Sequence, residues 1–450
     1  MNASDFIAGV KAGKIDPVKH TEEILREAKV VNDAYHYFLN IPEEEALAQA
    51  KKVNKSGKLA GLAISVKDCL VVKDVESTAG SRILKGYKPL FTATAVQRLM
   101  DEGAIVIGKT HQDEFGYGTF NLNVGVGLPV PKNPFDLNRV TGGSSGGAAG
   151  FTQKSTHTHV AIAESTGGSI VAPASFCGVY GLCPTYGAVS RYGLMDYANS
   201  LDKIGVMGRD LASVKLVYDV MKGKDAKDST SVEGKELPAT VKRVAVIKES
   251  LDVDPLVREK VLKKIEELGF EYDEISLPLA TKHALGTYYV IAMAETSTNL
   301  AKYCGIRYGV QNELEGNYNE YFSRIRDENF GKEAKRRLVL GTFVRMAGYR
   351  DQYYLKAMKI RTKIIAEYKE VFKKYDLIFS PTMPILPPRN DEMEKLTPLQ
   401  HYMMDILTVG PNLAGLPHLN LPAGFVNELP VGLLAIADHF GEQKLLSLEK

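Results

Sequence analysis

Glycine and serine are concentrated in one stretch of the chain, between Thr141 and Gly181. The stretch opens with TGGSSGGAAG at Thr141–Gly150 and ends with ESTGGSIVAPASFCGVYG at Glu164–Gly181. Because glycine loses much backbone entropy on ordering, such density is expected where the backbone passes close to another group or adopts a positive φ. Backbone N–H groups beside hydroxyls can hold an oxyanion or a phosphate. We therefore expect the chemistry of this protein to lie here.

Apolar segments on both sides of this stretch alternate between strand and helix patterns. Strands are expected over 62–66, 104–108 and 160–163, a helix over 92–102, and a second helix over 170–177 that starts directly after Ser169. Further on, residues 243–275 have the pattern of a β-α-β unit. This alternation predicts an α/β fold with a mixed central β-sheet flanked by helices on both sides.

The remaining segments indicate how the chain is organised. We expect one large domain over residues 1–450, in which segment 1–55 packs on the core as helices. Asp16-Pro17 is a typical helix start, an N-cap residue followed by proline at the first helical position. The other predicted elements are strands over 179–182, 188–190, 377–379, 420–422 and 431–436 and a long helical region over 279–375.

Composition restricts the classes of protein to consider. The 56 basic and 54 acidic residues give a net charge of +2, which does not predict nucleic-acid or membrane binding by the chain as a whole. The first residues, MNASDFIAGVKAGK, lack the apolar core expected of a signal peptide, and no apolar run approaches the roughly 18–20 residues of a membrane-spanning helix. The four cysteines have no metal-ligand spacing and are expected to be reduced. These features predict a cytoplasmic protein without a metal site or a membrane segment.

Three kinds of chemistry compete for the glycine- and serine-rich stretch. A phosphate loop would need Gly-Lys-Ser/Thr after the glycines, which is missing. Gly142–Gly146 fits the G-x-S-x-G pattern of an α/β-hydrolase elbow, but no apolar strand precedes it and no histidine lies in an obvious partner motif. The third possibility is acyl transfer with Ser169 as nucleophile, Ser144 as proton carrier and a buried Lys67 as base. On residues alone a plain connecting loop remains an alternative.

Three motifs resemble the successive signatures of the amidase signature family. They are GLAISVKD at Gly61–Asp68, GGSSGG at Gly142–Gly147 and TGGSI at Thr166–Ile170. The resemblance implies the amidase signature fold and a Ser–cis-Ser–Lys triad. Ser169 would be the nucleophile, Ser144 the cis-serine and Lys67 the base. The backbone amides of Thr166, Gly167, Gly168 and Ser169 would form the oxyanion hole.

Later motifs resemble one branch of that family, the glutaminase (A) subunits of tRNA-dependent amidotransferases, and within it the archaeal-like members. They include PASFCGVYGL at Pro173–Leu182, SLDKIG at Ser200–Gly205 and GKEAKRR at Gly331–Arg337. The resemblance implies a subunit that hydrolyses glutamine and passes ammonia to a partner. The partner would amidate Asp on tRNA(Asn), Glu on tRNA(Gln), or both. The resemblance also implies that this chain associates with B and C subunits in a heterotrimer and that tRNA binds mainly through the partner. It implies no cofactor on this chain, whereas the partner subunit would use ATP and Mg.

Residues for binding glutamine follow from the same resemblance. Free glutamine carries a carboxylate and an ammonium, so its pocket needs a guanidinium and a carboxylate. These would be Arg337 and Asp405, with Tyr288 as a supporting contact. The sequence departs from the family in having Ser165 where Asp is usual and Val171 where Arg is frequent, and in one extra residue between the two serines.

Two other functions fit parts of the same sequence. A stand-alone amidase acting on another small amide would share the triad but leave the charges of Arg337 and Asp405 unpaired. A catalytically silent scaffold or tRNA-binding subunit would not need Lys67, Ser144 and Ser169, and the near-zero net charge does not favour a dominant tRNA-binding role.

Overall fold

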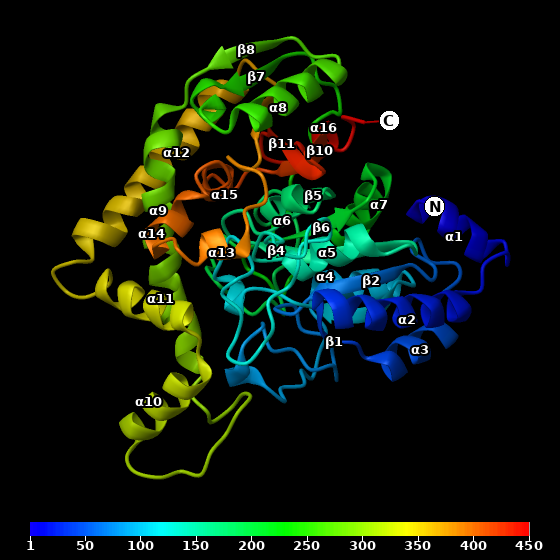
Figure 1. Cartoon of the computed structure of the whole chain (residues 1–450), viewed down its shortest axis with the longest axis vertical. Helices are drawn as coiled ribbons and strands as arrows, with labels where there is room; N and C mark the ends of the chain where they lie inside the picture. The colour runs from blue at the N-terminus through cyan, green and yellow to red at the C-terminus, as the bar shows by residue number, and fades with distance from the viewer. Residues whose placement is uncertain (450) are drawn as a thin grey trace.

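A mixed β-sheet of 11 strands runs through the molecule (Figure 1). In the computed structural model, which describes residues 1–449, the strand order is β1-β3-β2-β4-β6-β5-β10-β11-β9-β7-β8. The strands are β1 (Phe38–Asn40), β2 (Ala63–Lys67), β3 (Ile105–Thr110), β4 (His159–Ser165), β5 (Tyr180–Cys183), β6 (Lys203–Gly208), β7 (Val244–Ile247), β8 (Tyr272–Ile275), β9 (Leu377–Pro381), β10 (His418–Val426) and β11 (Leu429–Ala437).

Strand directions confirm the expected mixed sheet. β2 is parallel to β3 and β4, and β7 is parallel to β8 and β9, whereas the other neighbouring strands are antiparallel. The predicted β-α-β unit is present as β7, helix α8 (Pro255–Glu267) and β8. A parallel pair needs a crossover connection, and α4 (Thr94–Asp101) supplies it between β2 and β3.

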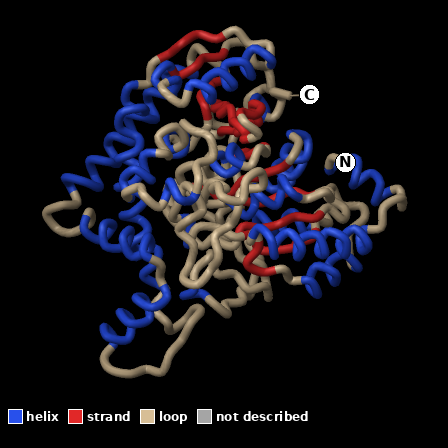
Figure 2. Tube along the Cα trace, in the orientation of Figure 1, coloured by secondary structure: helices blue, strands red, loops and turns tan. Residues whose placement is uncertain are grey.

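Helices cover the sheet on its outer sides, as Figure 2 shows in blue. Helices α9 to α12 stand together along one side of the molecule, and α10 extends beyond the rest of it (Figure 1). Besides α4 and α8, the helices are α1 (Ala3–Lys11), α2 (Pro17–Tyr35), α3 (Glu43–Lys51), α5 (Gly146–Lys154), α6 (Val171–Phe176), α7 (Leu211–Met221), α9 (Pro278–Asn299), α10 (Tyr318–Asn329), α11 (Lys332–Phe343), α12 (Lys356–Phe372), α13 (Asn390–Met393), α14 (Pro398–Met403), α15 (Val409–Leu413) and α16 (Glu442–Leu445). No helix within residues 1–449 combines the length and apolar character needed to cross a membrane.

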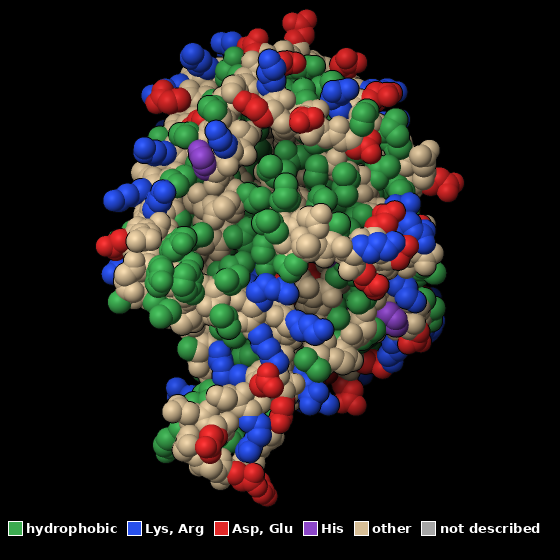
Figure 3. Space-filling model, turned by 60° about the vertical axis from the view of Figure 1, so that its left-hand side comes forward, with side chains coloured by type: hydrophobic (Ala, Val, Ile, Leu, Met, Phe, Trp, Pro, Cys, Tyr) green, Lys and Arg blue, Asp and Glu red, His purple; other side chains and the backbone are tan. Residues whose placement is uncertain are grey.

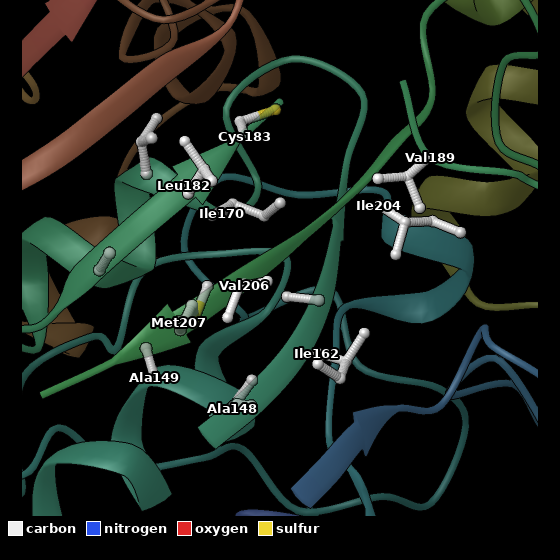
Figure 4. Close-up of a cluster of buried hydrophobic side chains, with 14 of the residues drawn as sticks. Ala148, Ala149, Ile162, Ile170, Leu182, Cys183, Val189, Ile204, Val206 and Met207 are labelled. Carbon is white, nitrogen blue, oxygen red and sulfur yellow. The ribbon is translucent and has the colours of Figure 1, made fainter. Parts of the chain in front are cut away.

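An apolar cluster fixes the elements on either side of the TGGSI motif. Figure 4 shows side chains from α5, β4, β5 and β6 meeting around Ile170, which stands directly before α6. Ile162, Leu182 and Val206 are 0% exposed. Burying side chains of this size contributes about 1.5–3 kcal/mol each. The backbone between β4 and α6 is therefore anchored at both ends.

Two local expectations differ from the structure. The N-terminal segment contains helices α1, α2 and α3 but also strand β1, which pairs antiparallel with β3. Its three residues are too short for a sequence pattern, and Phe38 is held by edge-on packing against Phe151 at 4.7 Å. The strand predicted over 188–190 is wrong. Val189 is buried there, but the segment turns, and Ser190 donates to Asp225 at 2.6 Å.

Candidate active site

Two parallel strands bring Lys67 and Glu164 to the same edge of the sheet. β2 ends at Lys67 and β4 ends one residue after Glu164, and Val66 pairs with Ile162 in the register between them. Because parallel strands present their carboxyl ends at one edge, the two side chains emerge as neighbours. Lys67 is 0% exposed, as the acyl-transfer interpretation requires of a base.

The Lys67 amine has three close oxygen partners. It donates to Ser144 Oγ at 2.7 Å, to Glu164 Oε2 at 2.9 Å and to the Glu164 carbonyl at 3.0 Å. Three acceptors match the three protons of an ammonium group. The first link of the proposed proton relay, between Lys67 and Ser144, is thus within hydrogen-bond distance.

The GGSSGG loop is clamped by the segment that follows β3. Gly143 N–H donates to the Thr119 carbonyl at 2.6 Å, and Asp113 N–H donates to the Ser144 carbonyl at 3.1 Å. A Cβ on Gly143 would lie 2.2 Å from Asp113 Oδ2, which explains why glycine occupies this position. The Gly143–Ser144 peptide bond is cis, as the resemblance implies.

Ser169 lines a small, tightly closed pocket. The cavity brings together residues from the two signature loops, from the segment after β3, and from the helical side of the molecule. They are Gly116, Gly118, Gly143, Gly167, Gly168, Ser169, Tyr288, Tyr289, Arg337 and Asp405. No hydrogen bond joins Ser144 to Ser169 in residues 1–449, so the second link of the relay stays a prediction.

The loop from Thr166 to Ser169 offers fewer free amides than the sequence suggests. Gly168 N–H donates to Ser165 Oγ at 3.1 Å and is therefore occupied. The N–H groups of Thr166, Gly167 and Ser169 find no protein acceptor in the described part of the chain. These three amides are the ones not occupied by a protein acceptor, and they remain candidates for holding a developing oxyanion.

Replacing Gly168 by Ala is expected to lower turnover at least tenfold. A Cβ on Gly168 would lie 2.3 Å from Thr408 Oγ1 and 2.7 Å from Thr408 Cβ, so the loop or its neighbour must move. A displacement of about 1 Å in a catalytic group can cost about 100-fold in rate. Steady-state kinetics check this, with Gly286→Ala as the control because a Cβ there meets nothing within 4 Å. Unchanged turnover in the Gly168 variant would show that the loop geometry is not critical.

The opposite wall of the cavity carries a buried guanidinium. Arg337 is 2% exposed, and its Nε donates to Glu333 Oε1 at 2.8 Å while Nη1 donates to the hydroxyl of Tyr197. Four tyrosine rings surround it at 5.2 to 5.4 Å from the guanidinium carbon: Tyr117, Tyr197, Tyr289 and Tyr402. These contacts hold the arginine in one orientation against the cavity.

Asp405 lies on the same wall and is held by a tyrosine that the sequence did not single out. The hydroxyl of Tyr289 donates to Asp405 Oδ2 at 2.5 Å. Burial raises the pKa of Asp405 to about 6, against the hydrogen bond from Tyr289, which lowers it. Tyr288, the residue selected from the sequence, also lines the cavity, and its ring lies against Gly167. Because Tyr288 and Tyr289 are adjacent on α9, the sequence alone could not show which of them contacts Asp405.

Glu164 is the other functional candidate that sequence reasoning missed. Its side chain is 3% exposed and contacts Lys67 directly. The signal was present, because a carboxylate interrupts the apolar pattern of β4 at the same edge where β2 ends in lysine. The family departures at Ser165 and Val171 leave the Lys67–Ser144 contact intact. Ser165 holds Gly168, and Val171 is buried in the core.

Comparison with known proteins identifies the family. Residues 19–446 match the profile of the family described as Amidase. The chain belongs to the amidase signature family. The matched amidase region runs from α2 to α16 and includes every residue of the site.

Several proteins whose sequences are similar to this chain have the same name. The chain is 44% identical over 425 residues to the A subunit of glutamyl-tRNA(Gln) amidotransferase from Archaeoglobus fulgidus, covering 92% of this chain and 91% of that protein. It is 40% identical to the protein of the same name from Sulfolobus acidocaldarius, covering 99% and 96%. The crystal structure of the Thermotoga maritima A subunit superposes with a TM-score of 0.80 at 34% identity, covering 98% and 92%. These likenesses confirm the resemblance to this branch, including archaeal members.

Proposed function

We propose that this chain is the glutaminase subunit of a tRNA-dependent amidotransferase. The observation that carries the proposal is the convergence of Ser169, Arg337 and Asp405 on one small cavity. Relatives named as the A subunit of glutamyl-tRNA(Gln) amidotransferase support the same assignment. The reaction is hydrolysis of the glutamine side-chain amide to glutamate and ammonia.

Three side chains perform the proton transfers. In its neutral form Lys67 accepts the proton of Ser144, which accepts the proton of Ser169, while Ser169 Oγ bonds to the amide carbon. The carbonyl electrons move to oxygen, and the oxyanion accepts hydrogen bonds from the loop amides. Collapse breaks the carbon–nitrogen bond, and the proton returns through Ser144 to the leaving nitrogen. Water then hydrolyses the glutamyl ester by the same relay.

The charges on the far wall select a free amino acid. Arg337 would hold the α-carboxylate of glutamine and Asp405 its α-ammonium, with Tyr288 and Tyr289 enclosing the aliphatic part. A neutral hydrophobic amide would leave Asp405 without an ammonium to pair with. It would also leave Arg337, whose Nε already donates to Glu333, without a carboxylate for its remaining N–H groups, which is costly. A stand-alone amidase for such substrates is therefore disfavoured.

The KM for glutamine is expected to rise below about pH 6. The raised pKa of Asp405, about 6, means that the carboxylate is lost as the pH falls through that value, and with it the pairing to the ammonium. The rise should approach about tenfold per pH unit, with a smaller change in kcat. Initial rates between pH 5 and pH 8 test this. An Asp405→Asn variant should show a high KM at every pH, and a flat wild-type KM would contradict the role of Asp405.

Partner subunits complete the proposed function. B and C subunits would form a heterotrimer with this chain, and the one that receives ammonia would use ATP and Mg. The net charge of +2 supports tRNA binding mainly through the partner. On the face shown in Figure 3, hydrophobic side chains (green) gather across the middle, and several Lys and Arg side chains (blue) lie below them. Translation enzymes of this kind act in the cytoplasm, which is where we place this protein.

The deciding experiment is amidation by the chain purified with its native partners. Glu-tRNA(Gln) and Asp-tRNA(Asn) are supplied separately with glutamine and ATP, and the aminoacyl group is analysed after release. Formation of Gln-tRNA(Gln), Asn-tRNA(Asn) or both supports the proposal, and a complex with Ser169→Ala should need added ammonia. Rapid turnover of other small amides by the isolated chain, with no glutamine hydrolysis, would favour a stand-alone amidase instead.

A further inference from the structure

Glu164 lies against the base but has no part in the mechanism above. Its Oε2 is 2.9 Å from Lys67 Nζ, and a second carboxyl, that of Asp202, lies behind it at 0% exposure. The hydroxyl of Thr166 connects the two carboxyls, at 2.8 Å from Glu164 Oε1 and 2.8 Å from Asp202 Oδ1. Lys67 therefore faces a buried chain of polar groups.

The hydrogen bonds among Glu164, Thr166 and Asp202 determine the net charge of the two carboxyls. A threonine hydroxyl has one proton and can donate to only one of the two carboxyls. The other carboxyl must donate to Thr166 Oγ1, so it carries a proton itself. Glu164 and Asp202 together thus carry one negative charge and not two.

Asp202 is the carboxyl that carries the proton. Asp202 Oδ2 accepts from the N–H of Tyr197 at 3.0 Å, and the N–H of Ala198 lies 3.0 Å from both Oδ1 and Oδ2. Oδ1 is also 2.8 Å from Thr166 Oγ1, to which it can direct its proton. Burial, together with the charge of Glu164, raises the pKa of Asp202 well above its usual value. The single negative charge of the two carboxyls then lies on Glu164, whose Oε2 accepts from the amine of Lys67 at 2.9 Å.

We propose that Glu164 is a positioning residue that sets the protonation state of the base. Its carboxylate holds the third proton on Lys67 in the resting site, and Ser169 becomes nucleophilic only when that proton has left to solvent. Glu164 acts through Lys67 and does not touch the substrate. The inference rests on the proposed role of Lys67 as the base.

Other titratable groups also face Lys67. Burial raises the pKa of the Cys69 thiol, which stays neutral, and raises the pKa of Asp113 to about 7. Behind them Lys109 is paired with Asp68 at 3.1 Å. These groups are the same in the wild-type protein and in the variants below, so a difference between two pH profiles isolates the substituted carboxyl.

The test is the rate at which a fluorophosphonate labels Ser169 as a function of pH. In this reaction Ser169 Oγ bonds to phosphorus, fluoride leaves, and the serine proton moves to Lys67 through Ser144. In Glu164→Gln the amide can still accept a hydrogen bond from Lys67 but no longer holds its proton by charge. The labelling rate should rise with pH, and this rise is the ascending limb of the pH profile. In Glu164→Gln we expect the ascending limb to move to lower pH by about 1–3 units.

Asp202→Asn is the matched control. Because it replaces a neutral acid by a neutral amide, its ascending limb should stay at the wild-type pH. An acid shift in this variant would show that Asp202 is ionised and would overturn the charge assignment. If the ascending limb of Glu164→Gln stays at the wild-type pH, Glu164 has only a structural role and the proposal is overturned. If that variant does not fold, Glu164→Ala removes the same charge, and failure of both to fold would equally mark a structural role.

The labelling assay separates this inference from the proposed function. Labelling of Ser169 with a shifted limb but no glutamine hydrolysis would contradict the glutaminase assignment and leave the role of Glu164 standing. Glutamine hydrolysis with an unshifted limb would do the reverse. Absence of labelling at Ser169 at every pH would contradict both.

Discussion

Ser169→Ala is expected to reduce glutamine hydrolysis by about 10⁴- to 10⁶-fold, the range seen when a serine nucleophile that works with a base is removed. The alanine leaves the cavity, Arg337 and Asp405 in place, so glutamine should still bind with a similar Kd. The loss should therefore be in kcat. Ammonia release, measured on the chain together with its partners, and glutamine binding by calorimetry check the two parts separately.

The control for this variant is another serine-to-alanine change in the same segment. Ser175 lies on α6, is 2% exposed and does not line the cavity. Ser175→Ala should keep wild-type turnover within a few-fold. Near-normal turnover in Ser169→Ala would end the assignment of the nucleophile, because neither Ser144 nor Lys67 faces the cavity to replace it.

Lys67→Met is expected to abolish activity and to destabilise the fold. Removing the base should lower kcat by at least about 10³-fold. Removing one partner of a buried ion pair leaves the carboxylate of Glu164 uncompensated, which costs about 3–5 kcal/mol of folding free energy. Chemical denaturation and steady-state kinetics measure these two effects independently.

A double variant separates stability from catalysis at this site. Lys67→Met combined with Glu164→Gln leaves no uncompensated charge, so most of the lost folding free energy should return while activity stays absent. Equal destabilisation in the single and double variants would contradict the ion pair. Activity within tenfold of wild type in either would contradict the role of Lys67 as base.

Much of the fold could be read from residue patterns. The β-α-β unit around α8 was predictable because its apolar residues alternate over lengths typical of each element. The glycines near Ser144 were predictable as points of close approach, and Gly143 indeed lies against Asp113. In contrast, β1 was not predictable because it has only three residues. Val189 is apolar because it is buried in a turn, and a buried turn gives the same apolar pattern as a short buried strand.

The site itself was only partly accessible from sequence. Family motifs selected Ser169 and Arg337, but residue spacing could not place them on opposite sides of one cavity, because they are 168 positions apart in the chain. The tyrosines around Arg337 come from four different parts of the fold. Glu164 interrupts the apolar pattern of β4, but only the register of the two parallel strands shows that it lies beside Lys67.

The most direct test of the proposed chemistry is to trap the covalent intermediate. The chain with its partner subunits is mixed with glutamine, quenched in acid within the first turnover, digested and analysed by mass spectrometry. We expect one glutamyl group in ester linkage on the peptide that contains Ser169, and none in Ser169→Ala. Steady ammonia release with no glutamyl group on that peptide, or with one on another residue, would contradict the assignment of Ser169 as the nucleophile.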